Sequence, residues 1–125
     1  MADLLEWASN WLEDQRTKHA TRTVTYRRGV DSVDLPASIG RTEFEIDSGV
    51  GVLERTESRD YLVTAADLVL GGWPALPQRG DRIEERAGTT VYIHEVMAPG
   101  KEPAWRYSDP YRKTLRIHTK LVSRE

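Results

Sequence analysis

The spacing of apolar residues near the N-terminus predicts an amphipathic helix over residues 1–20. Its apolar residues follow one another at intervals of one, three, three and one: Leu4, Leu5, Ala8, Trp11 and Leu12. These intervals place them on one stripe of a helix, with acidic residues on the other side. Trp7 lies off this stripe. We therefore expect the helix to present aromatic and apolar side chains to a partner, through Leu4, Leu5, Trp7 and Trp11.

The periodicity changes at Thr21. Residues 21–28, TRTVTYRR, are rich in β-branched and aromatic types and end at Gly29, which predicts a strand and a turn. Pro36 and Gly40 predict an irregular segment over residues 30–40, before residues 42–46, TEFEI, alternate as a strand does. After a glycine-rich link, residues 53–64, LERTESRDYLVT, predict one or two further strands.

Residues 80–96, GDRIEERAGTTVYIHEV, have the pattern of a β-hairpin. Gly80 and Asp81 form a tight turn into the first strand, because an Asp side chain bonds nearby backbone amides. Gly88 stands at the hairpin turn, where a positive φ is useful. Three apolar residues of the two strands are expected to fill the interior: Ile83, Val91 and Ile93.

The remaining chain completes a small β protein. Residues 113–122, KTLRIHTKLV, alternate apolar Leu115, Ile117 and Leu121 with polar residues and predict a last strand. Residues 71–81 and 98–111 are rich in Pro and Gly and predict two long loops. We predict a single domain over residues 1–125, mainly β with one N-terminal α-helix, in which residues 21–125 form a small antiparallel β-barrel or sandwich of five to seven strands.

Composition narrows the classes of function. The chain has 18 basic and 20 acidic residues, a formal net charge of −2, so it has no global field to attract nucleic acid or an anionic membrane. Without cysteine it has no disulfide, thiolate zinc site or cysteine nucleophile. The acidic, interrupted N-terminus lacks a signal-peptide pattern, and no apolar run is long enough to span a bilayer, so we expect a protein made in the cytoplasm without membrane contact.

The adjacent His94 and Glu95 raise the question of a hydrolytic or metal site. Strand alternation sends the two side chains to opposite faces, so they do not act together. If Val91 and Ile93 face the core, His94 and His118 both face solvent, where they could be cross-strand neighbours. A metal would still need a third ligand, and there is no H-E-x-x-H motif. We expect a solvated sheet face with no metal or cofactor, and Glu95 either at the strand end or paired with an arginine.

Other candidates for catalysis also favour structural roles. Residues 54–61, ERTESRDY, hold three carboxylates beside two arginines, which would keep the carboxylates ionised, so a charge ladder across strands or between subunits is the expected role. No serine stands in a nucleophile elbow, and no phosphate-binding glycine loop exists; the serines considered are Ser32, Ser38, Ser48 and Ser58. We therefore predict that the protein is not an enzyme.

Aromatic side chains gather in the two long loops. Trp73 lies in the first loop, and Trp105, Tyr107 and Tyr111 lie in the second. They either cap the core or anchor contacts with other subunits, since Trp and Tyr dominate protein interfaces. Stacking on single-stranded nucleic acid is a further alternative, which the acidic balance disfavours.

The hairpin motif and its flanking segments resemble the head-tail joining or connector proteins of tailed bacteriophages. The motif GD-x-[IV]…G-x-x-[YF]-x-V of that group is matched by Gly80, Asp81, Ile83, Gly88 and Tyr92, and more loosely by Val96. Residues 55–68, RTESRDYLVTAADL, resemble the segment that precedes this hairpin. The likeness covers about the last two thirds of the chain, and residues 28–51 match no pattern of the group.

The resemblance implies a structural virion protein, made in the host cytoplasm. Such a subunit would form a homo-oligomeric ring at the neck, between the portal and the tail, and DNA would pass through its channel without sequence-specific binding. The alternative is a small β-barrel binding module for a peptide or single-stranded nucleic acid.

Overall fold

A computed structural model describes residues 6, 21–47, 53–100 and 102–125. Its elements, in chain order, are β1 (Arg22–Arg28), β2 (Asp31–Asp47), β3 (Leu53–Thr64), the 3₁₀ turn η1 (Ala65–Asp67), β4 (Val69–Leu70), β5 (Trp73–Pro74), β6 (Arg82–Ala87), β7 (Thr90–Val96), β8 (Trp105–Tyr107) and β9 (Thr114–Arg124). The predicted N-terminal helix, with Leu4, Leu5, Trp7 and Trp11, lies outside the described residues and stays a prediction. Glu6 is described; its carboxylate lies 3.7 Å from the Lys113 Nζ.

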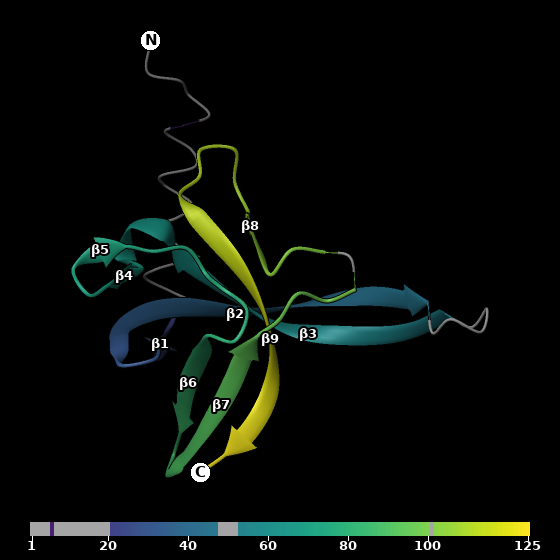
Figure 1. Cartoon of the computed structure of the whole chain (residues 1–125), viewed down its shortest axis with the longest axis horizontal. Coiled ribbons are helices and arrows are strands. Elements are labelled where there is room, and N and C mark those ends of the chain that lie inside the picture. Colours follow the sequence, from purple (N-terminus) through teal and green to yellow (C-terminus); the bar gives the residue numbers. More distant parts are fainter. Residues whose placement is uncertain (1–5, 7–20, 48–52, 101) are drawn as a thin grey trace.

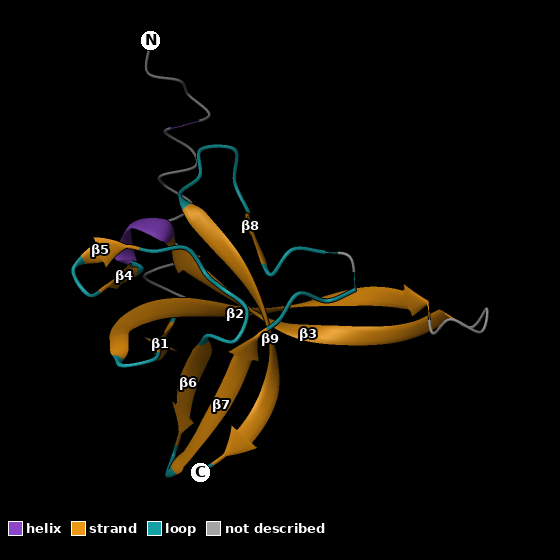
Figure 2. Ribbon diagram, in the orientation of Figure 1, coloured by secondary structure: helices purple, strands orange, loops and turns teal. Residues whose placement is uncertain are grey.

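Six antiparallel strands close into a barrel (Figures 1 and 2). Of the two predicted architectures, barrel or sandwich, the structure is the barrel. The strand order is β3-β2-β1-β6-β7-β9, and β3 pairs again with β9 to close the sheet. In that closing ladder Tyr61 lies opposite Ile117 and Arg59 opposite Thr119. β8 pairs with β9 as an additional strand, and β4 and β5 form a separate two-residue hairpin.

The interior follows the alternation of the strands. Tyr26, Tyr61, Ile83, Leu115 and Ile117 are fully buried, because each points inward from a strand whose neighbouring residues point outward. Since the ring of strands is small, these side chains are enough to fill its interior. The expected turns are confirmed: Gly80 and Gly88 have φ values of 90° and 62°.

The interior set of β7 differs from the sequence-based prediction. Ile83 lies opposite His94 in the ladder, so His94 shares the barrel interior with it. Ile93 lies opposite Glu84 and faces away from that interior; it is buried but is not part of the main core, and Val91 is half-buried. The prediction that Val91 and Ile93 fill the interior was wrong. Residues opposite each other in a ladder point to the same face, so the inward-facing Ile83 of β6 makes His94 and the other even-numbered residues of β7 face inward.

β2 runs unbroken for 17 residues, although Pro36 and Gly40 predicted an irregular segment. It pairs with β1 as far as Ala37 and with β3 from Ala37 onward, so Pro36 falls just before the β3 ladder begins. A proline is tolerated at such a free edge. Glycine suits position 40 because the Arg116 side chain passes close to the backbone there. A Cβ at this position would lie 3.2 Å from the Arg116 Nη2.

Beyond Gly40, β2 and β3 continue past the barrel as a two-stranded ladder, which we call the arm (residues 41–47 and 53–58). Figure 1 shows it projecting sideways while β9 turns toward the C-terminus. The ladder of the arm extends to the pair of Asp47 with Leu53. β3 is one continuous strand, so the alternative of two strands is excluded for residues 53–64.

The two long loops contain short strands that the sequence did not predict. Trp73 and Pro74 form β5, and residues 105–107 form β8 against the middle of β9. Within the described residues, no helix is long and apolar enough to cross a membrane.

Two leucines on β9 test where the core ends. Leu115 is fully buried, whereas Leu121, which the alternation placed in the core, is 47% exposed. Leu115→Ala should lower the free energy of unfolding by about 2–5 kcal/mol, because it removes buried contacts and leaves a cavity. Leu121→Ala should change it by only about 0.5 kcal/mol. Urea denaturation measures both, and similar losses at the two positions would contradict the described register.

Candidate partner-binding surface

A buried cluster holds one end of the barrel. The phenol of Tyr26 donates a hydrogen bond to the Asp81 carboxylate, and Arg28 binds the same carboxylate through Nε at 3.0 Å and Nη2 at 2.8 Å. The backbone N–H of Gln78 also donates to Asp81, at 2.9 Å. Burial, followed by the bond to Asp81, raises the pKa of Tyr26 well above its ordinary value, so its proton stays in place. The expected turn-forming role of Asp81 is confirmed, and the residue also links β1 to the start of β6.

A second cluster of the same chemistry closes the other end. The carboxylate of Glu85 accepts bonds from Arg59 at 2.7 Å, Tyr61 at 2.8 Å and Arg22 at 2.9 Å. Burial raises the pKa of Glu85, but the bonds from Arg59 and Tyr61 lower it more, so the net pKa lies below its ordinary value and Glu85 is a carboxylate. The cluster ties β1, β3 and β6 together across the barrel mouth.

His94 belongs to this second cluster. Its Nδ1 lies 3.0 Å from the Tyr61 oxygen. Since the Tyr61 proton is committed to Glu85, which can only accept, the Nδ1 of His94 must donate. Burial and then the nearby Arg59 guanidinium lower the pKa of His94 below its ordinary value of 6.5, and Glu85 opposes this only in part. His94 is therefore a neutral structural histidine.

A third cluster lies at the root of the arm. The Asp60 carboxylate accepts hydrogen bonds from Thr42, from Ser58 at 2.5 Å, from the Arg116 Nε at 2.6 Å and from the His118 Nδ1 at 2.8 Å. Burial raises the pKa of Asp60, but the hydrogen bonds from four side chains lower it by more than that. The net pKa of Asp60 lies well below its usual range; the four donors are His118, Ser58, Thr42 and Arg116. The carboxylate thus stays ionised while fully buried, and it joins β2, β3 and β9.

These clusters correct the predicted placement of the histidines. His94 and His118 are both buried and lie on opposite faces of the sheet, so neither the solvated face nor their cross-strand contact is present. Of the two alternatives predicted for Glu95, pairing with an arginine is confirmed: its carboxylate lies 4.0 Å from the Arg82 Nη2. No group of three or more His, Asp or Glu that could hold a metal occurs among the described residues.

The serines and the charged segment have structural positions. Ser58 donates to Asp60, and the Ser58 Oγ lies 3.4 Å from the same Nδ1 of His118 that Asp60 holds. A nucleophilic triad needs the serine at the other ring nitrogen, so this arrangement does not activate Ser58. Ser32 is exposed and Ser38 is buried in β2, while Ser48 lies outside the described residues. The predicted charge ladder over residues 54–61 is present in part, as Arg59 and Asp60 make ion pairs across strands.

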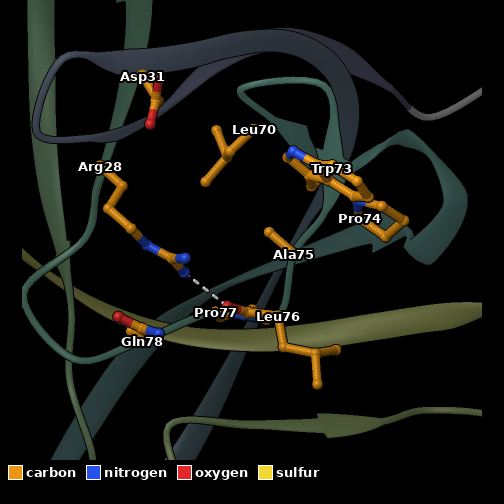
Figure 3. A pocket seen from close by; sticks show the side chains of 9 residues that line it. All are labelled: Arg28, Asp31, Leu70, Trp73, Pro74, Ala75, Leu76, Pro77 and Gln78. Atoms are coloured by element: carbon orange, nitrogen blue, oxygen red, sulfur yellow. Dashed lines mark hydrogen bonds between the residues drawn. The ribbon is translucent and has the colours of Figure 1, made fainter.

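The candidate partner-binding surface is an open groove of about 430 Å³ beside the Tyr26–Asp81 cluster (Figure 3). Its lining comes from β1, the β1–β2 turn, β4, β5 and the segment that follows: Arg28, Asp31, Leu70, Trp73, Pro74, Ala75, Leu76, Pro77 and Gln78. The Arg28 Nη2 donates to the Leu76 carbonyl at 2.6 Å, so the same guanidinium that holds Asp81 also fixes the groove wall. The groove is built on a braced loop.

Large apolar side chains are exposed along this groove. Trp73 is 77% exposed and Leu76 is 46% exposed, and Figure 3 shows Trp73 lying beside Pro74 at one end of the lining. Val30, in the neighbouring β1–β2 turn, is 97% exposed. An exposed tryptophan with apolar neighbours is typical of a protein-interaction site.

The other predicted contact residues lie elsewhere. Trp105 and Tyr107 pack edge to face at 5.2 Å and are half-buried against the core, and Tyr111 is half-buried in the loop between β8 and β9. In the hairpin, Ile83 belongs to the core and Tyr92 is half-buried. The structure therefore brings Trp105 and Tyr107 together and leaves Trp73 apart from them.

Sequence reasoning missed most of the residues that brace these surfaces. Arg28 binds Asp81 and Arg116 binds Asp60, and in both pairs the two residues are more than fifty positions apart in the sequence. One signal was available: Asp60 directly precedes the apolar run Tyr61–Val63 within one strand, where a buried acid needs a partner.

Comparison with known proteins adds one match. A protein-family model described as phage head-tail joining protein matches residues 2–125, nearly the whole chain. The match agrees with the resemblance found in the hairpin and extends it to residues 28–51, for which the sequence offered no pattern. No curated protein matches the chain.

Asp60→Asn tests the cluster at the root of the arm. The substitution removes the charge that Arg116 and His118 face, so the free energy of unfolding should fall by about 3–5 kcal/mol. Asp67→Asn, at an exposed position in η1, is the matched control and should change it by less than about 0.5 kcal/mol. Equal stability of the two variants in urea denaturation would show that Asp60 does not hold the strands.

His94→Asn tests the second cluster through pH. In the native protein the folded-state pKa of His94 is depressed, so the unfolded chain binds more protons and stability is lost as pH falls below 6.5. The loss from this group is at most about 1.4 kcal/mol per pH unit. An asparagine keeps an N–H donor for Tyr61 but does not titrate, so its stability should depend less on pH between 7.5 and 5. Parallel pH profiles for the two proteins would contradict a neutral, buried His94.

Proposed function

Because this chain belongs to the phage head-tail joining protein family, we propose that it is a ring-forming structural subunit of the virion neck. The family implies a virion component that assembles with portal and tail proteins. The finer proposal is that identical subunits close into a ring between portal and tail, and that DNA passes through the ring without sequence-specific binding.

The observation that carries this proposal is the exposed Trp73 groove. Trp73 has little contact with the core of its own chain, yet its loop is held in place by the Arg28 bonds to Asp81 and Leu76. A surface that is apolar and already ordered loses little conformational freedom when it binds, which favours association. We assign the groove to a contact with a neighbouring neck component.

Charge is compatible with a DNA channel. A net charge of −2 gives no strong attraction for phosphates, and tight binding would slow passage of the DNA. The buried carboxylates and histidines are occupied in hydrogen bonds that brace the barrel, which supports a structural role over a catalytic one.

Trp73→Ala tests the proposal directly. Since Trp73 is exposed, the variant should remain folded with an unchanged urea midpoint, whereas its binding to portal-bearing heads should weaken by about a hundredfold, as for a 2–3 kcal/mol interface anchor. Binding is measured by co-sedimentation with tail-less heads, and assembly by negative-stain microscopy. Arg86→Ala, exposed at the opposite end of the barrel, is the control and should bind normally.

The outcomes separate the proposal from its alternative. Closed rings on the portal of wild-type heads, lost with Trp73→Ala, are the expected result. A protein that stays monomeric on such heads, but binds a peptide or a single-stranded oligonucleotide through Trp73, would replace the neck subunit with the binding module.

A further inference from the structure

Two strands of the barrel end in edges that no described strand covers. β9 pairs with β3 only up to Thr119, and the Thr119 hydroxyl donates to the Arg59 carbonyl where that ladder stops. From Lys120 to Arg124, β9 pairs with β7 alone among the described strands. In the arm, β2 pairs with β3 alone beyond Ala37. Uncovered edges of this kind are templates for pairing with another strand.

The edge of β9 carries two exposed apolar residues. Leu121 lies opposite His94 and Ser123 opposite Ile93, so Val122 is the extra residue of a bulge; Leu121 and Val122 are 47% and 40% exposed. Consecutive apolar side chains beside an uncovered edge would be covered by a strand added to that edge, since the added strand contributes side chains to both faces.

The two edges have opposite charge. Residues 42–47 of β2, TEFEID, contain three acidic residues and no basic one, whereas residues 120–124 of β9, KLVSR, contain two basic residues and no acidic one. Two arms would repel each other, as would two β9 edges, but an arm and a β9 edge attract.

The edges also open in different directions. The uncovered edge of β9 is the one that pairs with β3 up to Thr119, whereas the uncovered edge of β2 is the one that pairs with β1 up to Ala37, on the side of the arm away from β3 (Figure 1). A pairing between two such different surfaces of identical subunits is head-to-tail, and head-to-tail contacts generate rings when the rotation closes.

We infer that the outer edge of β2 in the arm of one subunit pairs with the β9 edge, residues 120–124, of the next copy of this chain. The barrel sheet then continues from subunit to subunit, with the acidic arm on the basic edge and Leu121 and Val122 covered. This inference rests on the proposed ring and specifies its subunit contact.

A proline at Arg124 tests the main-chain part of the contact. Glu125 and Val91 exchange both of their backbone hydrogen bonds, so by alternation the N–H of Arg124 points away from β7 to the uncovered edge. Arg124→Pro removes that N–H without removing a bond to β7, and Arg124→Ala removes the same charge but keeps the N–H. Relative to Arg124→Ala, Arg124→Pro should weaken ring formation on portal-bearing heads by about tenfold. The urea midpoints of both variants report that the barrel remains folded.

Cross-linking tests the identity of the two edges, and the absence of native cysteine makes it clean. Subunits with Glu43→Cys are mixed with subunits with Val122→Cys on the heads and treated with a short bismaleimide. The expected product is a dimer that contains one subunit of each kind. Subunits with Glu43→Cys mixed with subunits with Arg86→Cys, near the β6–β7 turn, should give no cross-linked dimer.

The outcomes distinguish this inference from the proposed function. Rings that form equally well with Arg124→Pro and Arg124→Ala, or rings without the Glu43–Val122 product, overturn the edge pairing and leave the ring intact. If the wild-type protein forms no ring on portal-bearing heads, the proposed function itself fails. Rings with the mixed dimer, weakened by the proline, support both.

Discussion

The Asp60 carboxylate is fully buried and accepts hydrogen bonds from side chains of β2, β3 and β9. It lies opposite His118, one pair before the closing ladder ends at Arg59 with Thr119, where β3 leaves β9 to enter the arm. Because a buried charge must keep its partners, the three strands are held in one register at this point. Gly40 lies under the same side chain: the Arg116 that reaches Asp60 comes so close that a Cβ there would make a tight contact of 3.2 Å with its Nη2.

The two ends of the barrel repeat one solution with different consequences. At each end a buried tyrosine donates to a carboxylate that also binds arginine: Tyr26 to Asp81, and Tyr61 to Glu85. Buried ion pairs of this kind add less to stability than to the choice of a single arrangement, since any slip would leave charges unpaired. The first end uses Arg28 to fix the Trp73 groove. The second cluster closes the barrel mouth beside the arm. The positions of the Trp73 groove and of the arm therefore both depend on buried charges.

Local patterns were enough for much of the fold. Alternation and turn residues correctly predicted β1, the β6–β7 hairpin with Gly80 and Gly88, and β9, because each depends on neighbouring residues in the sequence. The errors arose where distant contacts decide. Pro36 and Gly40 lie within a strand because of where β3 and Arg116 come to rest, and His94 faces inward because Ile83 does. Trp73 was predicted either to cap the core or to anchor a contact, and it is exposed. Its bracing by Arg28 and Asp81 depends on residues more than fifty positions apart, which no local pattern reveals.

A protein with uncovered strand edges must avoid pairing them at random, because such edges drive aggregation. The charge pattern of this chain limits the alternatives. The outer strand of the arm has only acidic residues among its charges beyond Thr42, and the end of β9 has only basic ones, so arm-to-arm and β9-to-β9 pairing both bring like charges together. The remaining combination joins unlike edges on different sides of the molecule. If it forms, association is confined to one head-to-tail geometry, and the rigid root of the arm at Asp60 fixes the angle between successive subunits. A fixed angle is the condition under which a chain of subunits closes into a ring of defined size.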